Sequence, residues 1–523
     1  MTLALKLVAT AKLEDAAAAL AQVEKETPSE ELRSTALQAA AGILFNMRDY
    51  PAAAVLMAAG AKGSPDSSQV VARANMLGSI KRVDDYPIKT DTPEALIRSL
   101  FFLSVLDGMR DSDFDRVEAP EALIGMSAEE RKKEHESARH SMKGTAAISD
   151  KGVADLVLSL MQVRTDQNGE DGYRVRMLAA INSTNETLFV SKDGNEYRIL
   201  GEAKTLEGVG WRVLGDVKKG DLAAARKWLD WVREDVKIAG GDDPLDGPVF
   251  PRIWSKGSQG GENEIRYAAS VLIGESKHGK EAIPALREAM EKTTAEPAKT
   301  YAEIAYVTAC ANAELWKEAL AVAKPLAEGH PESPRMAAQL MHIYTRMQRW
   351  SDVEAVASER LARDPEEMAA GRAFAEAKAG EGKFQESEAL SRKMADSAKG
   401  SLYDWNQFGW FALFAGDLTA EKISRMQQAM GTAPDAGILH TLATMYADAG
   451  KGTEARETIL TAMRKWGLAE PDSNSWLVFG RLAEQFGVLD EAEADYKKVK
   501  NEPGSGPFSS YVLAQRRLAG LRK

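Results

Sequence analysis

The 523-residue sequence predicts a mainly α-helical chain of stacked repeats, interrupted by a small module that mixes helices and strands. Two observations predict this fold class. A bulky residue stands just before a helix of small residues at Trp316, Trp350, Phe384 and Leu418, at steps of 34 residues, and Gly452 continues the phase. Between about 66 and 204 the phase is lost, and strand-like segments appear. A period of this length is typical of arrays in which each two-helix unit buries its apolar face against its neighbours.

The strongest copies of the repeat carry a common motif. One reads Trp405-x2-Phe408-Gly409, and another reads Trp476-x2-Phe479-Gly480. These residues resemble the tetratricopeptide repeat signature, which implies two helices per unit and a superhelical solenoid. Small residues let the helix axes approach closely, and large residues fill the remaining gaps. We count about ten units, which cover roughly 1–65 and 205–507.

The repeat phase also predicts the domain boundaries. They are N-terminal repeat-like units at 1–65, with a weak copy at 11–28; an inserted module at 66–204; one unit plus a Gly/Pro-rich loop at 205–261; the main array at 262–507; and a capping helix at 508–523. Position 1 falls just inside the first helix of a repeat. The sequence therefore leaves open that the chain is the C-terminal part of a longer protein.

The inserted module is expected to be α+β. Helical apolar spacing predicts helices at 67–81, 92–106 and 127–142. Strands are expected within 153–163, 173–181 and 186–200, because turn residues around Gly169 and Gly194 separate segments rich in Val, Leu, Ile, Tyr and Phe. The order of elements resembles the cystatin-type fold of the nuclear-transport-factor-2-like superfamily, whose members often enclose a pocket.

Composition limits the function classes. The net charge of −11 argues against nucleic acid as a partner, because phosphate binding needs a basic face. The single cysteine, Cys310, excludes an internal disulfide and fits a reducing compartment. An apolar run of membrane-spanning length and a signal peptide are both missing, so we expect a cytoplasmic protein.

The sequence contains no recognisable catalytic or metal-binding motif. His135 and His140 are five residues apart, which places their imidazoles on different sides of a helix, so a solvated charged face is expected there. The segment Gly274-x4-Gly279-Lys280 lacks the Ser or Thr that a phosphate-binding loop requires. We therefore predict neither a cofactor nor a metal, and not an enzyme.

The tetratricopeptide resemblance implies that the first helix of each unit lines an inner groove that receives peptides. The family's inward-facing positions fall, unit by unit, on Tyr301 and Thr308; Arg335, His342 and Arg346; Arg372 and Glu376; Tyr403, Asn406 and Trp410; His440 and Thr444; and Arg481 and Glu484. The arginines predict attraction to a peptide with acidic or carboxylate groups. The family's chaperone-binding carboxylate clamp is not matched.

Two aromatic residues keep alternative interpretations. Trp410 lies outside the packing motif of its repeat and is either an exposed anchor for a ligand or buried against a neighbouring helix. Trp254 lies in the loop at 240–261, which is either a surface connection or a flap over one edge of the groove.

The leading functional hypothesis is a scaffold or adaptor that binds a peptide or a partner protein. The alternative is that the inserted module binds a small molecule or catalyses a reaction, with the repeats as support. A packed apolar interior in the module favours the first hypothesis, and a deep cavity with converging titratable groups favours the second.

Overall fold

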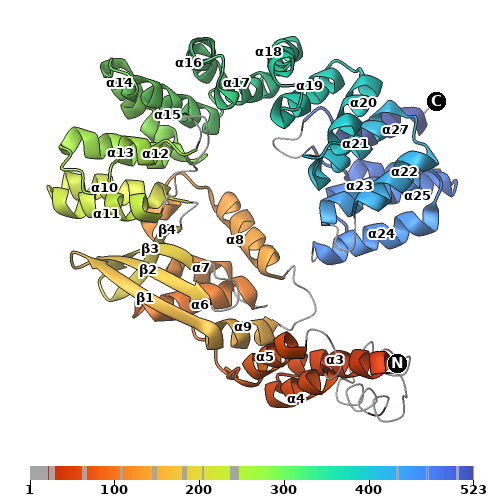
Figure 1. The fold of residues 1–523 in the computed structure, drawn as a ribbon, viewed down its shortest axis with the longest axis horizontal. Helices are drawn as coiled ribbons and strands as arrows, with labels where there is room; N and C mark the ends of the chain where they lie inside the picture. The colour runs from red at the N-terminus through yellow and green to blue at the C-terminus, as the bar shows by residue number, and fades with distance from the viewer. Residues whose placement is uncertain are drawn as a thin grey trace. The chain divides into compact units, whose positions relative to one another are not determined.

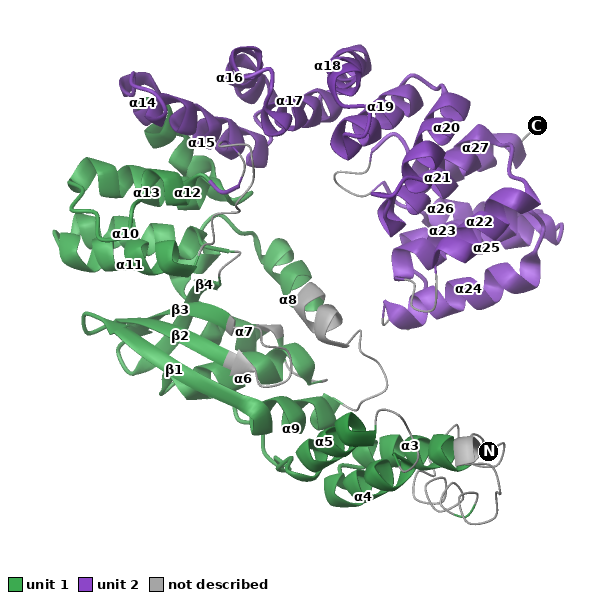
Figure 2. Cartoon of the chain, viewed as in Figure 1, with its two compact units in different colours: residues 1–238, 249–288 green, residues 239–248, 289–523 purple. Residues whose placement is uncertain are grey.

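The computed structural model describes residues 22, 30–61, 67–106, 110–143, 150–179, 185–202, 205–235, 245, 247–430, 435–466, 468, 470–501 and 506–521. The chain forms two compact units (Figure 2): unit 1 comprises 1–238 with 249–288, and unit 2 comprises 239–248 with 289–523. The weak repeat copy predicted at 11–28 lies outside the described residues. Among the helices that are described, none combines the length and the apolar character needed to cross a bilayer.

Unit 2 is a stack of helical hairpins (Figure 1). The hairpins are α15 (Ala298–Asn312) with α16 (Trp316–Gly329), α17 (Pro334–Arg346) with α18 (Trp350–Arg363), α19 (Met368–Gly380) with α20 (Phe384–Ala395), α21 (Leu402–Ala415) with α22 (Ala420–Met430), α23 (Ala436–Asp448) with α24 (Gly452–Lys465), and α25 (Ser473–Gln485) with α26 (Leu489–Lys498). A last helix, α27 (Ser510–Leu521), packs against α25 and α26. The second helices α16, α18, α20 and α24 begin at predicted repeat positions, so the tetratricopeptide-type solenoid is confirmed.

The large and small residues of the repeat motif pack as their sizes predict. Phe408 is fully buried, and the following Gly409 faces Thr441 and Met445 of the next repeat. A Cβ atom built on Gly480 would lie 2.7 Å from the ring of Tyr496, which belongs to the second helix of the same hairpin. Glycine at this position therefore allows the two helices to approach closely.

Unit 1 contains further helices, one of which lies within the range 66–204 expected for the inserted module. They are α3 (Glu30–Asn46), α4 (Tyr50–Gly60) and α5 (Ser67–Gly78), then α10 (Glu207–Lys218), α11 (Leu222–Asp235), α12 (Phe250–Ile253), α13 (Glu262–Gly274) and the short η2 (Gly279–Ala282). Helices α3 and α4 form a hairpin on which α5 packs, and α10 contacts both α11 and α13. Helix α14 (Ile283–Lys292) spans the boundary between the units.

The inserted module combines helices with one antiparallel sheet. Its helices are α6 (Pro93–Val105), α7 (Asp111–Val117), η1 (Pro120–Leu123), α8 (Ala128–Lys143) and α9 (Asp150–Leu160). Strands β1 (Met161–Asn168), β2 (Gly172–Ala179), β3 (Asn185–Asp193) and β4 (Glu196–Glu202) pair in sequential order. Gly169 and Gly194 adopt positive φ values of 64° and 59° in two of the tight turns, as the predicted hairpin chemistry requires.

The sheet is covered on both faces. On one face, Val175, Leu188 and Ile199 join an apolar cluster with residues of α6 and α7, including Leu96 and Phe114. On the other face, α11 packs through its tryptophans: the Trp228 ring lies 6.4 Å from the ring of Phe189, and the Arg174 guanidinium lies 5.1 Å from the centre of Trp231. Apolar side chains thus fill the space between the sheet and α6–α7.

One predicted strand is partly a helix. The segment expected as a strand from Val153 to Val163 forms α9 as far as Leu160, and the strand starts only at Met161. Its Asp155 is fully buried and accepts hydrogen bonds from Arg48, Tyr50 and the backbone of Val83. Its run of Val and Leu residues does not by itself separate a buried helix from a strand, and the packing of α9 decides between them.

Two residues of unit 1 that the sequence analysis discussed are buried. His135, expected on a solvated face, is buried; its ring stacks on Phe114 at 4.1 Å and lies 3.2 Å from Glu118. Trp254 is also buried, and its indole donates a hydrogen bond to Asp230 of α11 at 2.9 Å. This hydrogen bond links the Gly/Pro-rich loop to α11 within unit 1.

Candidate peptide-binding surface

Three of the predicted groove residues line one cavity in unit 2. Asn406 and Trp410 come from α21, and His440 comes from α23, the first helix of the next repeat. The cavity has a volume of about 420 Å³ and is completed by Trp466, Asn474 and the segment 506–510. Neighbouring first helices therefore bring these side chains together, as the repeat register predicts.

Burial sets the charge of His440. The side chain is almost fully buried between the rings of Trp410 at 5.7 Å and Trp466 at 6.1 Å. Desolvation lowers the pKa of His440 to about 4, although Asp472 and the carbonyl of Asn474 oppose this shift. The imidazole is therefore neutral near pH 7, and its Nε2–H group donates to the Asn474 carbonyl oxygen at 3.2 Å.

Trp410 contacts the C-terminal segment of its own chain. Its indole Nε1–H donates to the carbonyl oxygen of Phe508. The side chain is partly buried against the core of the repeats, and its ring lies 6.0 Å from Phe414. Of the two interpretations of Trp410, the structure favours packing, but the residue still lines the cavity.

Arg372 and Tyr403 form a second cluster. The Arg372 guanidinium makes two hydrogen bonds to the Asp404 carboxylate, at 2.7 and 2.9 Å, and lies 5.3 Å from the centre of the Tyr403 ring. Burial opposes ionisation of Asp404, but hydrogen bonds from Arg372 and Ser401 hold its pKa below the ordinary value. The positive charge of Arg372 is thus already balanced, while Tyr403 is 54% exposed.

The other predicted groove residues contact side chains or backbone away from this cavity. Arg346 lies 5.4 Å from the centre of the Trp316 ring and 3.6 Å from Glu314, and His342 packs against the edge of the same ring. Burial, with a contribution from Arg346, lowers the pKa of His342. Arg335 donates to the carbonyl oxygens of Leu245 and Gly247.

Arg481 is paired within the repeats. Its guanidinium lies 2.7 Å from Asp448 and 3.2 Å from Glu484, and only 13% of its side chain is exposed. Arg517 of α27 also pairs with Asp448. The Arg481 charge is therefore balanced by carboxylates of this chain.

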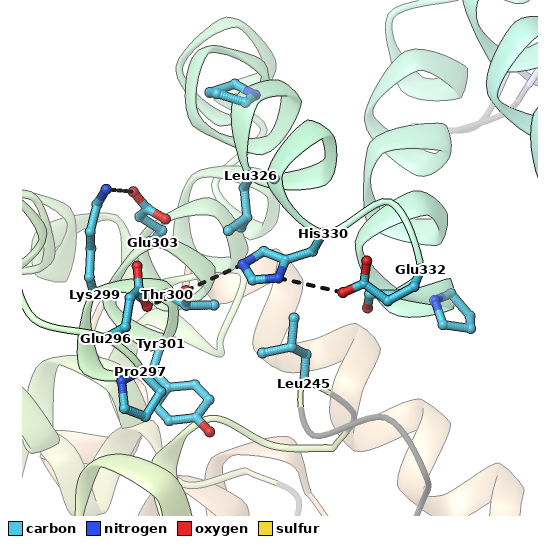
Figure 3. A pocket seen from close by; sticks show the side chains of 14 residues that line it. Leu245, Glu296, Pro297, Lys299, Thr300, Tyr301, Glu303, Leu326, His330 and Glu332 are labelled. Carbon is cyan, nitrogen blue, oxygen red and sulfur yellow. Dashed lines mark hydrogen bonds and ion pairs between the residues drawn. The ribbon is translucent and has the colours of Figure 1, made fainter.

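A larger cleft lies at the other end of unit 2. It has a volume of about 830 Å³ and lies between α15, α16 and the start of α17 (Figure 3). Leu326 and Leu245 are buried apolar residues of its lining, and Tyr301, one of the predicted inward-facing residues, also lines it. Sequence reasoning identified Tyr301 but not the cleft.

A chain of polar contacts crosses this cleft. The Thr300 hydroxyl donates to Glu296 at 2.7 Å and lies 3.4 Å from His330 Nε2, while His330 Nδ1 lies 3.9 Å from Glu332 (Figure 3). The hydrogen bonds from Thr300 lower the pKa of Glu296. Because the Thr300 proton points to Glu296, its oxygen can only accept from His330. Three glutamates and one lysine line the cleft, and Lys299 lies 3.8 Å from one of them, Glu303.

Some residues that line the cavity and the cleft lie outside the repeat positions, so the repeat pattern did not predict them. Trp466 follows α24, and the segment 506–510 lies beyond the last hairpin. Three prolines line the cleft: Pro297 precedes α15, Pro325 lies within α16, and Pro334 begins α17. This clustering of prolines is a signal that sequence reasoning could have used.

Comparisons with known proteins give likenesses in structure alone. No protein-family profile matches the chain, and no curated protein matches it in sequence. Among solved structures, a tetratricopeptide repeat protein from Parabacteroides merdae matches with 16% identity and a TM-score of 0.30, over 61% of this chain and 100% of its own. Yeast Tom70 matches with 11% identity and a TM-score of 0.34, over 99% and 94% of the two chains.

A third similar structure is Naa15/Naa10 bound to HypK-THB. The match has 10% identity and a TM-score of 0.37, and it covers 99% of this chain and 84% of that one. At such low TM-scores, the fold assignment rests on the hairpins and the repeat period of the chain itself.

Proposed function

We propose that the chain is a protein-binding scaffold and that unit 2 holds a segment of a partner on the surface of its first helices. The observation that carries the proposal is the cavity of Asn406, Trp410 and His440. It combines hydrogen-bonding groups with indole surface on the first helices of successive repeats, an arrangement suited to anchoring a peptide ligand. A non-catalytic role is part of the proposal.

The proposal also concerns the charge of the partner. The expected acidic ligand has weak support, because Arg372 and Arg481 already pair with Asp404 and Asp448. The cleft around His330 supports a basic side chain instead, since its glutamates outnumber its lysine. We therefore propose a partner segment with at least one basic residue.

The inserted module is proposed to serve as a structural part of unit 1. This rests on the apolar side chains that fill the space between its sheet and α6–α7. A reducing compartment such as the cytoplasm is proposed from the single cysteine, Cys310, which is buried.

A peptide-display selection on the full chain tests the proposed function. A random library is selected against the wild type, and the enriched peptides are then measured on Trp410→Ala, Arg372→Ala and Glu332→Ala. We expect one enriched motif whose affinity falls about tenfold or more on Trp410→Ala, since central aromatic residues dominate such interfaces. Glu332→Ala should weaken only peptides with basic residues. If no motif is enriched, or if all variants bind equally, the surface is not a binding site.

A further inference from the structure

The C-terminal segment of the chain inserts a phenylalanine among aromatic residues of earlier repeats. Four rings surround Phe508, and we call them the aromatic seat: Trp350 at 6.0 Å, Phe384 at 6.4 Å, Phe411 at 5.7 Å and Phe414 at 6.3 Å between ring centres. Trp350 and Phe384 are the first residues of α18 and α20, and the other two lie on α21. The seat is therefore built by three successive hairpins.

Polar contacts hold the same segment in register. The Phe508 carbonyl accepts from the Trp410 indole, and the Ser510 hydroxyl donates to Asn474 at 2.7 Å. The Arg516 guanidinium lies 4.8 Å from the ring centres of both Phe384 and Phe414. Residues 506–521 thus contact repeats from α18 to α25. A segment with this reach crosses the stacked repeats and does not only continue the stack.

The start of this segment is a tight turn that presents one aromatic side chain, as a short peptide ligand could. Ser509 donates its backbone N–H to Gly506 at 3.2 Å, so Gly506-Pro507-Phe508-Ser509 makes a turn that presents the Phe508 ring. Phe508 itself is only partly buried, whereas Phe411 and Phe414 are buried. The turn also forms part of the wall of the cavity that Trp410 and His440 line. The same surface therefore holds a segment of this chain beside the space proposed for a partner.

We infer that the aromatic seat is an exchangeable binding site, which prefers a partner turn or loop that presents an aromatic side chain. This inference rests on the proposed function and names the chemistry of the partner. Phe508 occupies the seat in cis and competes with the partner. The partner's ring takes the place of the Phe508 ring, which is edge-on to Phe384, Phe411 and Phe414 and tilted against Trp350, and the partner's backbone carbonyl accepts from Trp410.

The test uses the full-length chain and a fluorescent peptide with the sequence of residues 506–510, which carries Phe508 without α27. Phe508→Ala empties the seat, and Phe486→Ala is the matched control because Phe486 is 73% exposed. We expect Phe508→Ala to bind the peptide about tenfold or more tightly than the wild type, because a tethered competitor acts at an effective concentration on the order of millimolar. Phe486→Ala should behave as the wild type, and a peptide with alanine in place of Phe508 should not bind.

A more conservative substitution keeps the test informative if Phe508→Ala does not fold. Phe508→Leu keeps an apolar side chain but removes the ring, and it should also bind the peptide more tightly than the wild type. Equal binding by wild type and both variants overturns the inference, and so does unfolding of both variants, which would make Phe508 a permanent part of the core. Wild-type dimers that Phe508→Ala dissociates would assign the seat to a second copy and also overturn it. A selected peptide motif without aromatic residues would leave the proposed function standing and remove this inference.

Discussion

At the scale of single residues, burial and pairing decide what the polar groups of unit 2 can do. Arg372 and Arg481 look like ligand-binding charges in the sequence, yet each faces a carboxylate of its own chain. His440 looks like a polar groove residue, yet two tryptophans enclose it. Residue type and helical position predicted that these groups share a surface, but their partners come from neighbouring repeats.

His440 makes stability depend on acid. Its pKa is about 4 in the folded chain and about 6.5 when unfolded. The unfolded state therefore binds more protons below pH 6.5, and unfolding becomes easier as pH falls toward 4. We expect a loss on the order of 3 kcal/mol over that range from this group. Urea unfolding at several pH values should show it, and His440→Gln should flatten that part of the profile. An NMR titration that places the His440 pKa near 6.5 would contradict the prediction.

At the scale of elements, the repeat period explains where helices begin and how closely they pack. Large residues such as Phe408 fill the interior of a hairpin, and small residues such as Gly480 set the distance between its helices. Residue size is tightly constrained at these positions because the interior of a hairpin is closely packed. In the module, the same reasoning predicted the turn glycines but assigned the start of a strand to residues of α9.

Gly480→Ala tests the packing rule. The added Cβ would lie 2.7 Å from Tyr496, so a ring or a helix must shift, and we expect a loss of about 1–3 kcal/mol. Gly329→Ala is the matched control, because Gly329 also lies in a helix and its Cβ would meet nothing within 4 Å. The control should be neutral or slightly stabilising. Thermal melts in which both variants match the wild type would show that the close approach is not required.

At the scale of the whole molecule, contacts between distant parts of the chain define each unit. In unit 1, Arg48 and Tyr50 of the N-terminal hairpin meet Asp155 of the module, more than 100 residues later. In unit 2, Phe508 reaches back to Trp350. Such contacts connect the predicted domains, and they place the module together with the N-terminal helices in one compact unit.

Asp155→Ala should destabilise unit 1 strongly. It removes a fully buried carboxylate and leaves Arg48, with 10% of its side chain exposed, without its main partner. Breaking one side of a buried pair costs about 3–5 kcal/mol. Asp84→Ala is the control, since Asp84 also lies 3.9 Å from Arg48 but is 76% exposed. Its loss should cost at most about 1 kcal/mol. Similar unfolding free energies for the two variants, measured in urea, would refute the role of burial.

The sequence by itself determined the repeat period, the helical hairpins and the presence of an antiparallel module. These features follow from patterns within one repeat or between adjacent repeats, where helical geometry fixes which residues face each other. Only the tertiary structure decided the partners of Arg372 and Arg481, the burial of His135 and the place of Phe508. The reason is physical: these features depend on contacts outside the residue's own helix or hairpin, many of them far along the chain, and local periodicity carries no record of them.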